Sequence, residues 1–511
     1  MAMASPTRSR LCPPPPLLRA ICAALLLTTP ACDNAASKSP SLSVDAFVDG
    51  LSAVDLNALA TEARASAVPG SVDAIFLELT TRYPGFGGAY EDGKGRVVLI
   101  SSRPNETRTA SGDVVSDLAD FSGLTGRAAQ AFRDRSVSVE AGQFDFAQLA
   151  AIKLAVRQLA GRFPIVGIDA DERTNRVALD LDDAAGDLLD AVPAALAALG
   201  VPTGAVVVGT VRPPRFVADP VAGPSALLAT DVGGSSLTLS DSVRPIAGGL
   251  QVDRPGRCTL GLPLWYTDGA SGQKALGFLT ASHCTGFTGF NNGAQWGQPT
   301  AAGGYIGLEI EDPPLTNCGA NSSNCDLVDV ALAKFTNGHD TVSLVAPGGV
   351  YLTESASSTG SGGYTVTGSP VPLWPLTLYT GASVNKVGWR TGWTTGQVTA
   401  TGYDIAISVR HPDGVMRLTW VRGTTRTSVP VAVGDSGSAL FKLVYGEEPP
   451  NELAPLDGDG NPLSGWFSGI LSACGGCGAG PSGPSYFVPW AAVESALTTG
   501  LSFSNSQSPA W

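Results

Sequence analysis

Apolar residues recur with two different periods along this chain. From residue 145 to 159 they recur every three or four positions, which predicts a helix opened by Asp145 with one apolar face. A second helix of this kind is expected to end at Gly200. Beyond about residue 245 the runs are short, alternate with period two and are rich in Gly, Thr, Ser and Val, as in strands. The pattern therefore predicts an α/β region followed by an all-β domain. The apolar positions of the two helices are Leu149, Ile152, Val156 and Leu159, then Leu188, Leu189, Leu196 and Leu199.

The α/β region, which we assign to residues 44–212, contains a repeat. The run RYPGFG that begins at Arg82 recurs as RFPIVG at Arg162, and RVVL at Arg96 recurs as RVAL at Arg176, at a constant offset of 80 residues. In each copy an acidic turn separates the two runs, so each copy predicts a β-hairpin. A further strand is expected over residues 205–208. An internal duplication is the simplest account of the constant offset.

A histidine, an aspartate and a serine are candidate catalytic residues because of their local motifs and their order along the chain. His283 lies in the run TASHC, Asp329 opens an apolar strand expected over residues 329–333, and Ser436 lies in the run GDSG. A nucleophile, a base and a carboxylate that orients the base are what acyl transfer needs, and chymotrypsin-type enzymes have them in this chain order. We therefore expect a serine endopeptidase that cuts peptide bonds through an acyl-enzyme.

Each of these residues also has a simpler interpretation. The GDSG run could be a turn in a Gly-rich chain, and His283 could be a hydrogen-bonded histidine of the core. Asp326 competes with Asp329, because both follow closely on Cys325. Alternation over residues 330–335 favours a strand that starts at Asp329, so we prefer Asp329.

Several further motifs are similar to those of one known protein family. The chain resembles bacterial chymotrypsin-fold peptidases, such as the streptogrisins and α-lytic protease, over about residues 244–500. This resemblance implies an all-β peptidase domain of two barrels over residues 245–511. The matching motifs are IAGG (246–249), RCTLG (257–261), GFLTASHC (277–284), VNKVG (384–388), TGWTTGQVTA (391–400), FSGILS (467–472) and YFVP (486–489).

The resemblance also implies roles for individual residues. The backbone N–H groups of Gly434 and Ser436 would form an oxyanion hole, and Ser472 would lie at the bound substrate. Lys386 would pair with Asp435 and support the oxyanion loop; the alternative is that Lys386 is a solvated surface lysine.

Two positions near the expected substrate pocket bear on specificity. Pro430 stands where an acidic residue would select Arg or Lys, and Leu471 stands where glutamate-specific relatives carry a histidine. Both indicate an uncharged, apolar side chain at the residue before the cut.

The N-terminal region resembles the propeptides of the same relatives, which assist folding and then block the site. An all-β domain with many non-local pairings folds slowly, so a folding template is useful. The alternative is a stably attached accessory domain. Residues 213–244 are expected to be a Pro- and Gly-rich linker, and maturation is expected to cut it between about Ala229 and Ile246.

Residues 1–32 have the pattern of an export signal, with arginines before a short apolar run and a small-residue cleavage point. Cys32, which follows Pro30 and Ala31, is a candidate for lipidation, and ordinary secretion is the alternative. In either case the chain is expected outside the cytoplasm, in the medium or the bacterial cell envelope. It would contact a membrane only if Cys32 is lipidated.

Six of the nine cysteines lie in the peptidase region, an even number that agrees with export. The resemblance implies a disulfide between Cys258 and Cys284, beside the histidine. Cys318 and Cys325 are expected to close a small loop, and Cys474 and Cys477 a local bridge. The CxxC spacing of the last pair also fits a redox motif, but no βαβ pattern surrounds it.

Composition limits the other function classes. The net charge of −13 and the lack of a basic stripe argue against nucleic acid as a partner. We expect neither a metal nor a cofactor, because no histidines stand at ligand spacing and the run from Asp457 to Asn461 lacks the glycine and glutamate of a calcium loop. The expected partners are a peptide or protein substrate and the chain's own N-terminal region. The alternative from another class is a catalytically latent cell-envelope binding protein on a peptidase fold.

Overall fold

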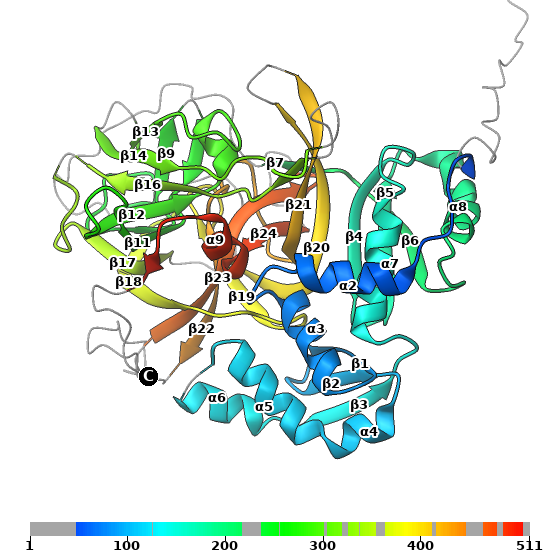
Figure 1. Ribbon diagram of the computed structural model, residues 1–511. Coiled ribbons are helices and arrows are strands. Elements are labelled where there is room, and N and C mark those ends of the chain that lie inside the picture. The colour runs from blue at the N-terminus through cyan, green and yellow to red at the C-terminus, as the bar shows by residue number, and fades with distance from the viewer. Residues whose placement is uncertain are drawn as a thin grey trace, which may run out of the picture. The chain divides into compact units, whose positions relative to one another are not determined.

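Helices and strands are described from residue 48 onward in the computed structural model of this chain (Figure 1). The export signal, Cys32 and the run from Asp457 to Asn461 lie outside the described residues. Val48–Trp511 form one unit. None of the helices in the described part of the chain has the length and apolar character needed to cross a bilayer. The described residues are 48–124, 126–216, 237–254, 256–300, 304–318, 325–336, 338–353, 363–410, 415–445, 463–477 and 484–503.

The first half of the α/β region is a three-stranded sheet with helices. Strands β1 and β2 form an antiparallel hairpin, and β3 lies parallel to β2. The side chains of Asp55 and Ser71 cap the first two helices by accepting hydrogen bonds from backbone N–H groups. In chain order the elements are α2 (Leu56–Ser66), α3 (Val72–Arg82), β1 (Phe86–Glu91), β2 (Val97–Ser101), α4 (Pro104–Thr109), α5 (Ser111–Phe121), α6 (Gly126–Arg133) and β3 (Val137–Ala141).

The second half repeats this order of a helix, an antiparallel hairpin, further helical turns and a parallel strand. Helix α7 (Phe146–Arg157) starts where the sequence predicted, because Asp145 and Gln148 form a capping box. The hairpin joins β4 (Ile165–Asp171) and β5 (Arg176–Asp182), and β6 (Val206–Val211) lies parallel to β5. Between them lie the 3-10 helix η2 (Gly186–Ala191) and helix α8 (Val192–Ala198).

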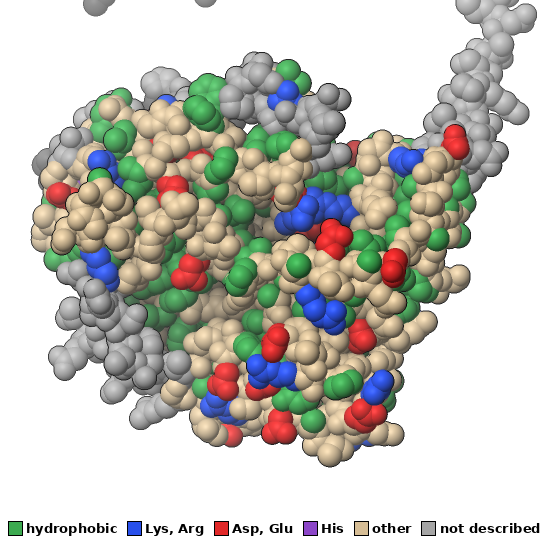
Figure 2. Space-filling view, in the orientation of Figure 1, with side chains coloured by type: hydrophobic (Ala, Val, Ile, Leu, Met, Phe, Trp, Pro, Cys, Tyr) green, Lys and Arg blue, Asp and Glu red, His purple; other side chains and the backbone are tan. Residues whose placement is uncertain are grey.

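Acidic and basic side chains are interspersed on the face of the molecule drawn in Figure 2. Several of them lie over the part of the view that Figure 1 assigns to helices α4–α6. Arg82 pairs with Asp117 at 3.2 Å, and Arg103 pairs with Glu106 at 3.6 Å. The two arginine side chains are 46% and 57% exposed, so each pair adds little to stability.

The first part of the C-terminal region, from about residue 245, is an antiparallel sheet of eight strands. Its order is β10-β9-β13-β14-β16-β12-β11-β25. Strands β10 and β11 follow one another along the chain. Among the described residues they do not pair with each other, so the sheet does not close into a barrel. The strands are β9 (Gln251–Arg254), β10 (Gly256–Thr259), β11 (Leu262–Thr267), β12 (Lys274–Thr280), β13 (Gln295–Gly297), β14 (Tyr305–Glu311), β16 (Ala331–Phe335) and β25 (Leu501–Ser502).

The second part contains a closed ring of strands. Strands β19, β20, β21, β24, β23 and β22 pair in succession, and β22 pairs again with β19. A buried apolar cluster that includes Val384, Leu440 and Phe487 fills part of this ring. The strands are β19 (Ser383–Gly388), β20 (Gly392–Arg410), β21 (Met416–Thr427), β22 (Ala439–Tyr445), β23 (Leu463–Gly475) and β24 (Ser485–Pro489), and helix α9 (Trp490–Ala496) follows.

The N-terminal region continues the second sheet. Strand β4 pairs antiparallel with β20, so the sheet runs from the ring of strands into β4, β5 and β6. Two charged side chains of α7 reach strands of the C-terminal region: Lys153 lies 3.4 Å from Asp404 of β20, and Arg157 lies 2.5 Å from Asp326 of β15 (Cys325–Leu327). The two regions therefore share a sheet and buried ion pairs.

The segment expected to be a linker, residues 213–244, is ordered at both ends. Strand β7 (Pro214–Phe216) pairs antiparallel with the end of β23. At the other end, Leu239 N–H donates to the Tyr364 carbonyl at 3.0 Å, and residues 217–236 lie outside the described residues. The described ends of this segment are therefore held by backbone hydrogen bonds to the C-terminal region.

Candidate active site

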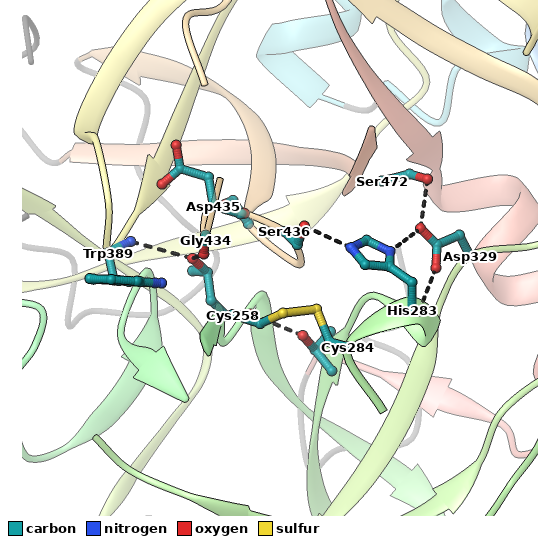
Figure 3. The surroundings of a disulfide bond; sticks show 12 residues. Cys258, His283, Cys284, Asp329, Trp389, Gly434, Asp435, Ser436 and Ser472 are labelled. Carbon is teal, nitrogen blue, oxygen red and sulfur yellow. Dashed lines mark hydrogen bonds and ion pairs between the residues drawn. A yellow bond between two sulfur atoms is a disulfide. The ribbon is translucent and has the colours of Figure 1, made fainter. Parts of the chain in front are cut away.

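Asp329, His283 and Ser436 form a continuous hydrogen-bonded chain (Figure 3). His283 Nδ1 lies 2.7 Å from Asp329 Oδ2, and His283 Nε2 lies 2.7 Å from Ser436 Oγ. A carboxylate at Nδ1 keeps the ring proton there, which leaves Nε2 free to accept the serine proton. The three residues that the sequence analysis selected are thus brought together from positions far apart in the chain.

Each of the three side chains is held by a different element. His283 lies in the 3-10 turn η3 (Ser282–Thr285) at the end of β12, and Ser436 lies in the turn before β22. Asp329 lies in the connection between β15 (Cys325–Leu327) and β16. The strand that the sequence predicted from Asp329 begins later, at Ala331, because the Asp329 carboxylate turns toward the histidine and also accepts from His283 N–H at 2.9 Å.

Ser472 completes the surroundings of the aspartate. Its hydroxyl donates to Asp329 Oδ2 at 2.6 Å, and both residues are fully buried. The carboxylate therefore accepts three hydrogen bonds, from the His283 ring, the His283 backbone and Ser472. This gives the Ser472 side chain a contact that the sequence analysis did not predict; the substrate contact expected of Ser472 stays a prediction.

Asp326, the competing aspartate, has a different environment. It pairs with Arg157 of α7 at 2.5 Å and with Arg422 of β21 at 2.6 Å. Its side chain therefore points into the contact with the N-terminal region, while Asp329 points to the histidine.

The backbone around the nucleophile needs glycine. Gly434 has a φ of 107°, and a Cβ there would lie 2.8 Å from the Trp389 ring. Within the described part of the chain, neither Gly434 N–H nor Ser436 N–H donates a hydrogen bond. Two unpaired N–H groups on either side of Asp435 are what an oxyanion hole requires.

Asp435 and Lys386 form a buried ion pair beneath this loop. Lys386 Nζ lies 3.1 Å from Asp435 Oδ2, and both side chains are 0% exposed. Asp435 also accepts from Thr391 Oγ1 at 2.6 Å and from the backbone N–H groups of Arg390, Thr391 and Ala432 at 3.0–3.1 Å. Burial lowers the pKa of the Lys386 ammonium, and the charge of Asp435 opposes that shift. Lys386 is thus not the solvated surface lysine of the alternative interpretation.

Replacing Lys386 by methionine is expected to lower both turnover and stability. It would leave the Asp435 carboxylate buried without its cation, and breaking a buried pair in this way costs about 3–5 kcal/mol. The loop that carries Gly434 and Ser436 is held by Asp435, so we expect turnover of the folded protein to fall at least about tenfold. Melting temperature and kcat, measured on the same preparation, test this.

The double variant Lys386→Met with Asp435→Asn is the matched control. It removes both charges, so most of the lost stability should return while turnover stays low. Unchanged turnover in Lys386→Met alone would contradict a supporting role for the pair.

A second carboxyl lies behind the histidine turn. Asp312 Oδ2 accepts from Ser282 Oγ at 3.0 Å and from Thr285 Oγ1 at 3.3 Å. Burial raises the pKa of Asp312 to about 8, although the hydrogen bond from Ser282 works in the opposite direction. The sequence analysis did not single out this residue, because nothing in its local pattern marks a buried acid.

All three expected disulfides are present: Cys258–Cys284, Cys318–Cys325 and Cys474–Cys477. The first connects β10 to the turn that carries His283 (Figure 3). The second lies directly before the segment that leads to Asp329. The third lies at the end of β23, where β7 pairs with it.

Phe216 of β7 is a site residue that the sequence analysis missed. Its ring stacks on the His283 imidazole, with the ring centres 4.2 Å apart and an angle of 6° between the planes. No local signal could have found it, because Phe216 stands in a Pro-rich segment typical of linkers. In the described ranges no group of three or more His, Cys, Asp or Glu side chains could hold a metal ion.

No family model matches this chain, and neither does any curated protein. Among the solved structures similar to it are bacterial chymotrypsin-fold serine proteases. They include Thermobifida fusca protease A (22% identity, TM-score 0.30) and Nocardiopsis protease (23%, 0.27), each alignment covering 50% of this chain and 98% of the other. Cellulomonas bogoriensis chymotrypsin is 23% identical with a TM-score of 0.28, and the alignment covers 51% of this chain and 99% of that one.

Proposed function

We propose that this chain is an exported serine endopeptidase, made as a precursor. The observation that supports this most is the hydrogen-bonded chain from Asp329 through His283 to Ser436. Acyl transfer by serine needs these three groups in this mutual geometry.

In the proposed reaction, Ser436 Oγ attacks the carbonyl carbon of the scissile bond while His283 Nε2 takes the serine proton. Asp329 holds the ring and stabilises the imidazolium that forms. The N–H groups of Gly434 and Ser436 stabilise the charge on the carbonyl oxygen, and each such donor is worth roughly 3–4 kcal/mol. The imidazolium then gives its proton to the leaving amine. A water molecule, activated by the same histidine, releases the acyl group and regenerates the serine.

Labelling with a fluorophosphonate tests this function. We expect the mature protein to react at Ser436 alone, as located by mass spectrometry of the labelled peptide. The variant His283→Ala is expected to lose the labelling, because the serine then lacks its base. A folded mature protein that does not react would instead favour the latent binding protein on a peptidase fold.

The N-terminal region is proposed to act as folding template and inhibitor of the peptidase. Two contacts support this: β4 extends the peptidase sheet at β20, and β7 lies along β23 beside the histidine. Ser436 is fully buried and the His283 side chain is only 3% exposed. A substrate therefore needs the N-terminal region to move away or to be removed first.

The shared order of elements also supports the proposed duplication of the N-terminal region. In each half an antiparallel hairpin is followed by helical turns and then by a strand parallel to the second hairpin strand. The constant offset of 80 residues between the sequence copies agrees with this order.

Export is supported by the cysteines. All six cysteines of the peptidase region are paired in the structure, and disulfides persist mainly in oxidising compartments. The signal segment and the lipidation of Cys32 remain part of the proposal, as does a location in the medium or the cell envelope.

A further inference from the structure

A buried pair of carboxyl groups lies behind the turn that carries His283. Asp312 Oδ2 accepts from both hydroxyls of this turn, Ser282 Oγ at 3.0 Å and Thr285 Oγ1 at 3.3 Å. Glu309 of β14 lies within hydrogen-bonding reach of Asp312. Asp312 is 5% exposed and Glu309 is 2% exposed, so both carboxyls are nearly shut off from water. The reaction proposed for the site uses neither of them.

Each carboxyl group of this pair is fixed through one of its oxygens. Glu309 Oε2 accepts from the backbone N–H groups of Ala294 at 2.9 Å and Asn292 at 3.2 Å. The other oxygens, Asp312 Oδ1 and Glu309 Oε1, are buried, and neither is hydrogen-bonded to a donor in the described part of the chain. An ionised carboxylate can only accept hydrogen bonds, whereas a protonated carboxyl can donate one. A single proton held between the two groups would therefore satisfy both oxygens.

The charges around the pair favour one proton on it. Arg254 of β9 is the cation that acts on Glu309. Asp329 adds a negative charge that acts on Asp312. His283, the titratable group of the turn itself, faces Asp329 with its Nδ1 at 2.7 Å. Arg254 can compensate one ionised carboxyl of the pair, while the like charges nearby oppose ionisation of the second.

The pKa values of the two carboxyls agree with a shared proton. Burial is the largest cause of the raised pKa of Asp312, about 8, and the charges of Glu309 and Asp329 act in the same direction. Burial also raises the pKa of Glu309, but two backbone N–H groups and Arg254 oppose that shift. The proton therefore resides mainly on Asp312, and the pair loses it as one coupled unit.

From this geometry we propose that Asp312 is a positioning residue for His283: with Glu309 it holds one shared proton, and the turn Ser282–Thr285 keeps its place only while that proton is present. Two ionised carboxyls repel each other strongly in a buried site. Glu309 is fixed by backbone N–H groups, so Asp312 is the group that moves, and its hydrogen bond to Ser282 displaces the residue next to His283. The inference rests on the proposed peptidase function and adds its regulation by pH.

The expected consequence is a loss of turnover in alkaline solution. Displacement of the turn lengthens the contact between His283 Nε2 and Ser436 Oγ, and small errors of placement are costly in catalysis. Since the pKa of Asp312 is about 8, we expect kcat of the mature enzyme to fall to about a tenth by about pH 9. KM should change little, because the turn acts on the proton transfer.

Two substitutions of Asp312 test this dependence on pH. Asp312→Ala leaves the hydroxyls of Ser282 and Thr285 without their acceptor, and should lower kcat at least about tenfold at every pH with little change in KM. Asp312→Asn resembles the protonated acid, because its amide oxygen can accept from the hydroxyls and its NH2 group can donate to Glu309. It should restore most of the lost kcat and remove the fall toward about pH 9.

Glu311→Gln is the matched control for these variants. Glu311 is the next acid of β14, and its carboxylate accepts from Thr498 and Thr499 instead of the turn. This variant should keep the wild-type dependence of kcat on pH. An alkaline fall that persists in Asp312→Asn, or a wild-type enzyme without such a fall, would overturn the proposal.

A measurement without catalysis keeps the inference separate from the proposed function. The pKa of Asp312 is raised in the folded chain, so the contribution of the pair to stability is complete below the ordinary pKa of a carboxyl and is lost as pH rises through about 8. In the uncut Ser436→Ala precursor, the unfolding equilibrium constant should rise by up to about tenfold per pH unit in this interval, relative to the same chain with Asp312→Asn. Melting curves from pH 5 to 9 measure the difference. A difference that stays constant would overturn the shared proton.

The proton between His283 Nδ1 and Asp329 reports whether the pair acts on the histidine. In the same precursor, the NMR resonance of this proton should shift when the pair titrates, in addition to any step from the imidazole itself. The added step should be absent with Asp312→Asn. The same pH dependence in both chains would leave the pair a structural role alone and overturn its action on His283, whether or not Ser436 of the mature protein reacts with fluorophosphonate.

Discussion

Ser436→Ala is expected to abolish peptide hydrolysis and to leave the precursor uncut. Ser436 Oγ is the group that His283 Nε2 faces at 2.7 Å, and among the described side chains no other hydroxyl lies at that nitrogen. Removal of the nucleophile of a serine protease lowers kcat by roughly a millionfold. Turnover of a peptide substrate, and the mass of the purified chain, give both readouts.

Two further variants show whether the loss is specific. Asp329→Asn keeps the shape of the aspartate but disfavours the productive histidine tautomer, so we expect a loss of about 10⁴-fold, smaller than that of Ser436→Ala. Ser408→Ala removes a serine from an exposed position of β20 and should change nothing. Normal processing of the Ser436→Ala chain would mean that another protease cuts it.

A peptidase region made without residues 48–216 is expected to stay inactive until that region is added as a separate chain. Two pairings of the closed ring, β19 with β22 and β21 with β24, join strands that are far apart along the chain, and such contacts form slowly. The N-terminal region offers β4 as a ready neighbour for β20, and α7 brings Lys153 and Arg157 to the carboxylates of Asp404 and Asp326. Recovery of peptidase activity over time after mixing measures the effect.

Arg157→Ala in the added chain should slow this recovery, because Asp326 then loses one of its two arginine partners, the more buried of them. Arg64→Ala, at an exposed position of α2, is the matched control and should leave recovery unchanged. A peptidase region that becomes active alone would favour an accessory role for the N-terminal region, as would a full chain that is active without being cut.

The sequence by itself determined the elements and the chemistry of the site. The helix from Asp145 and the hairpin strands follow from local periodicity and capping, which act over a few residues. The disulfide pairs were also predicted correctly, from the family resemblance and from short spacings. His283 and Ser436 could be selected because their motifs and their order along the chain are those of serine peptidases. Asp329 was preferred to its competitor Asp326 only because of the alternation over residues 330–335.

The tertiary structure decided which groups meet. Asp326 and Asp329 are nearly equivalent in sequence, but only folding brings one to Arg157 and Arg422 and the other to His283. Phe216 could not be predicted as a site residue, since its partners Ala473 and His283 are distant in sequence and its own segment is typical of a linker. From the sequence alone, Lys386 could be a surface lysine or a member of a buried ion pair. The fold places it in a buried pair with Asp435. Periodicity reports on neighbours along the chain, whereas these contacts depend on pairings between distant strands, and only the folded chain specifies them.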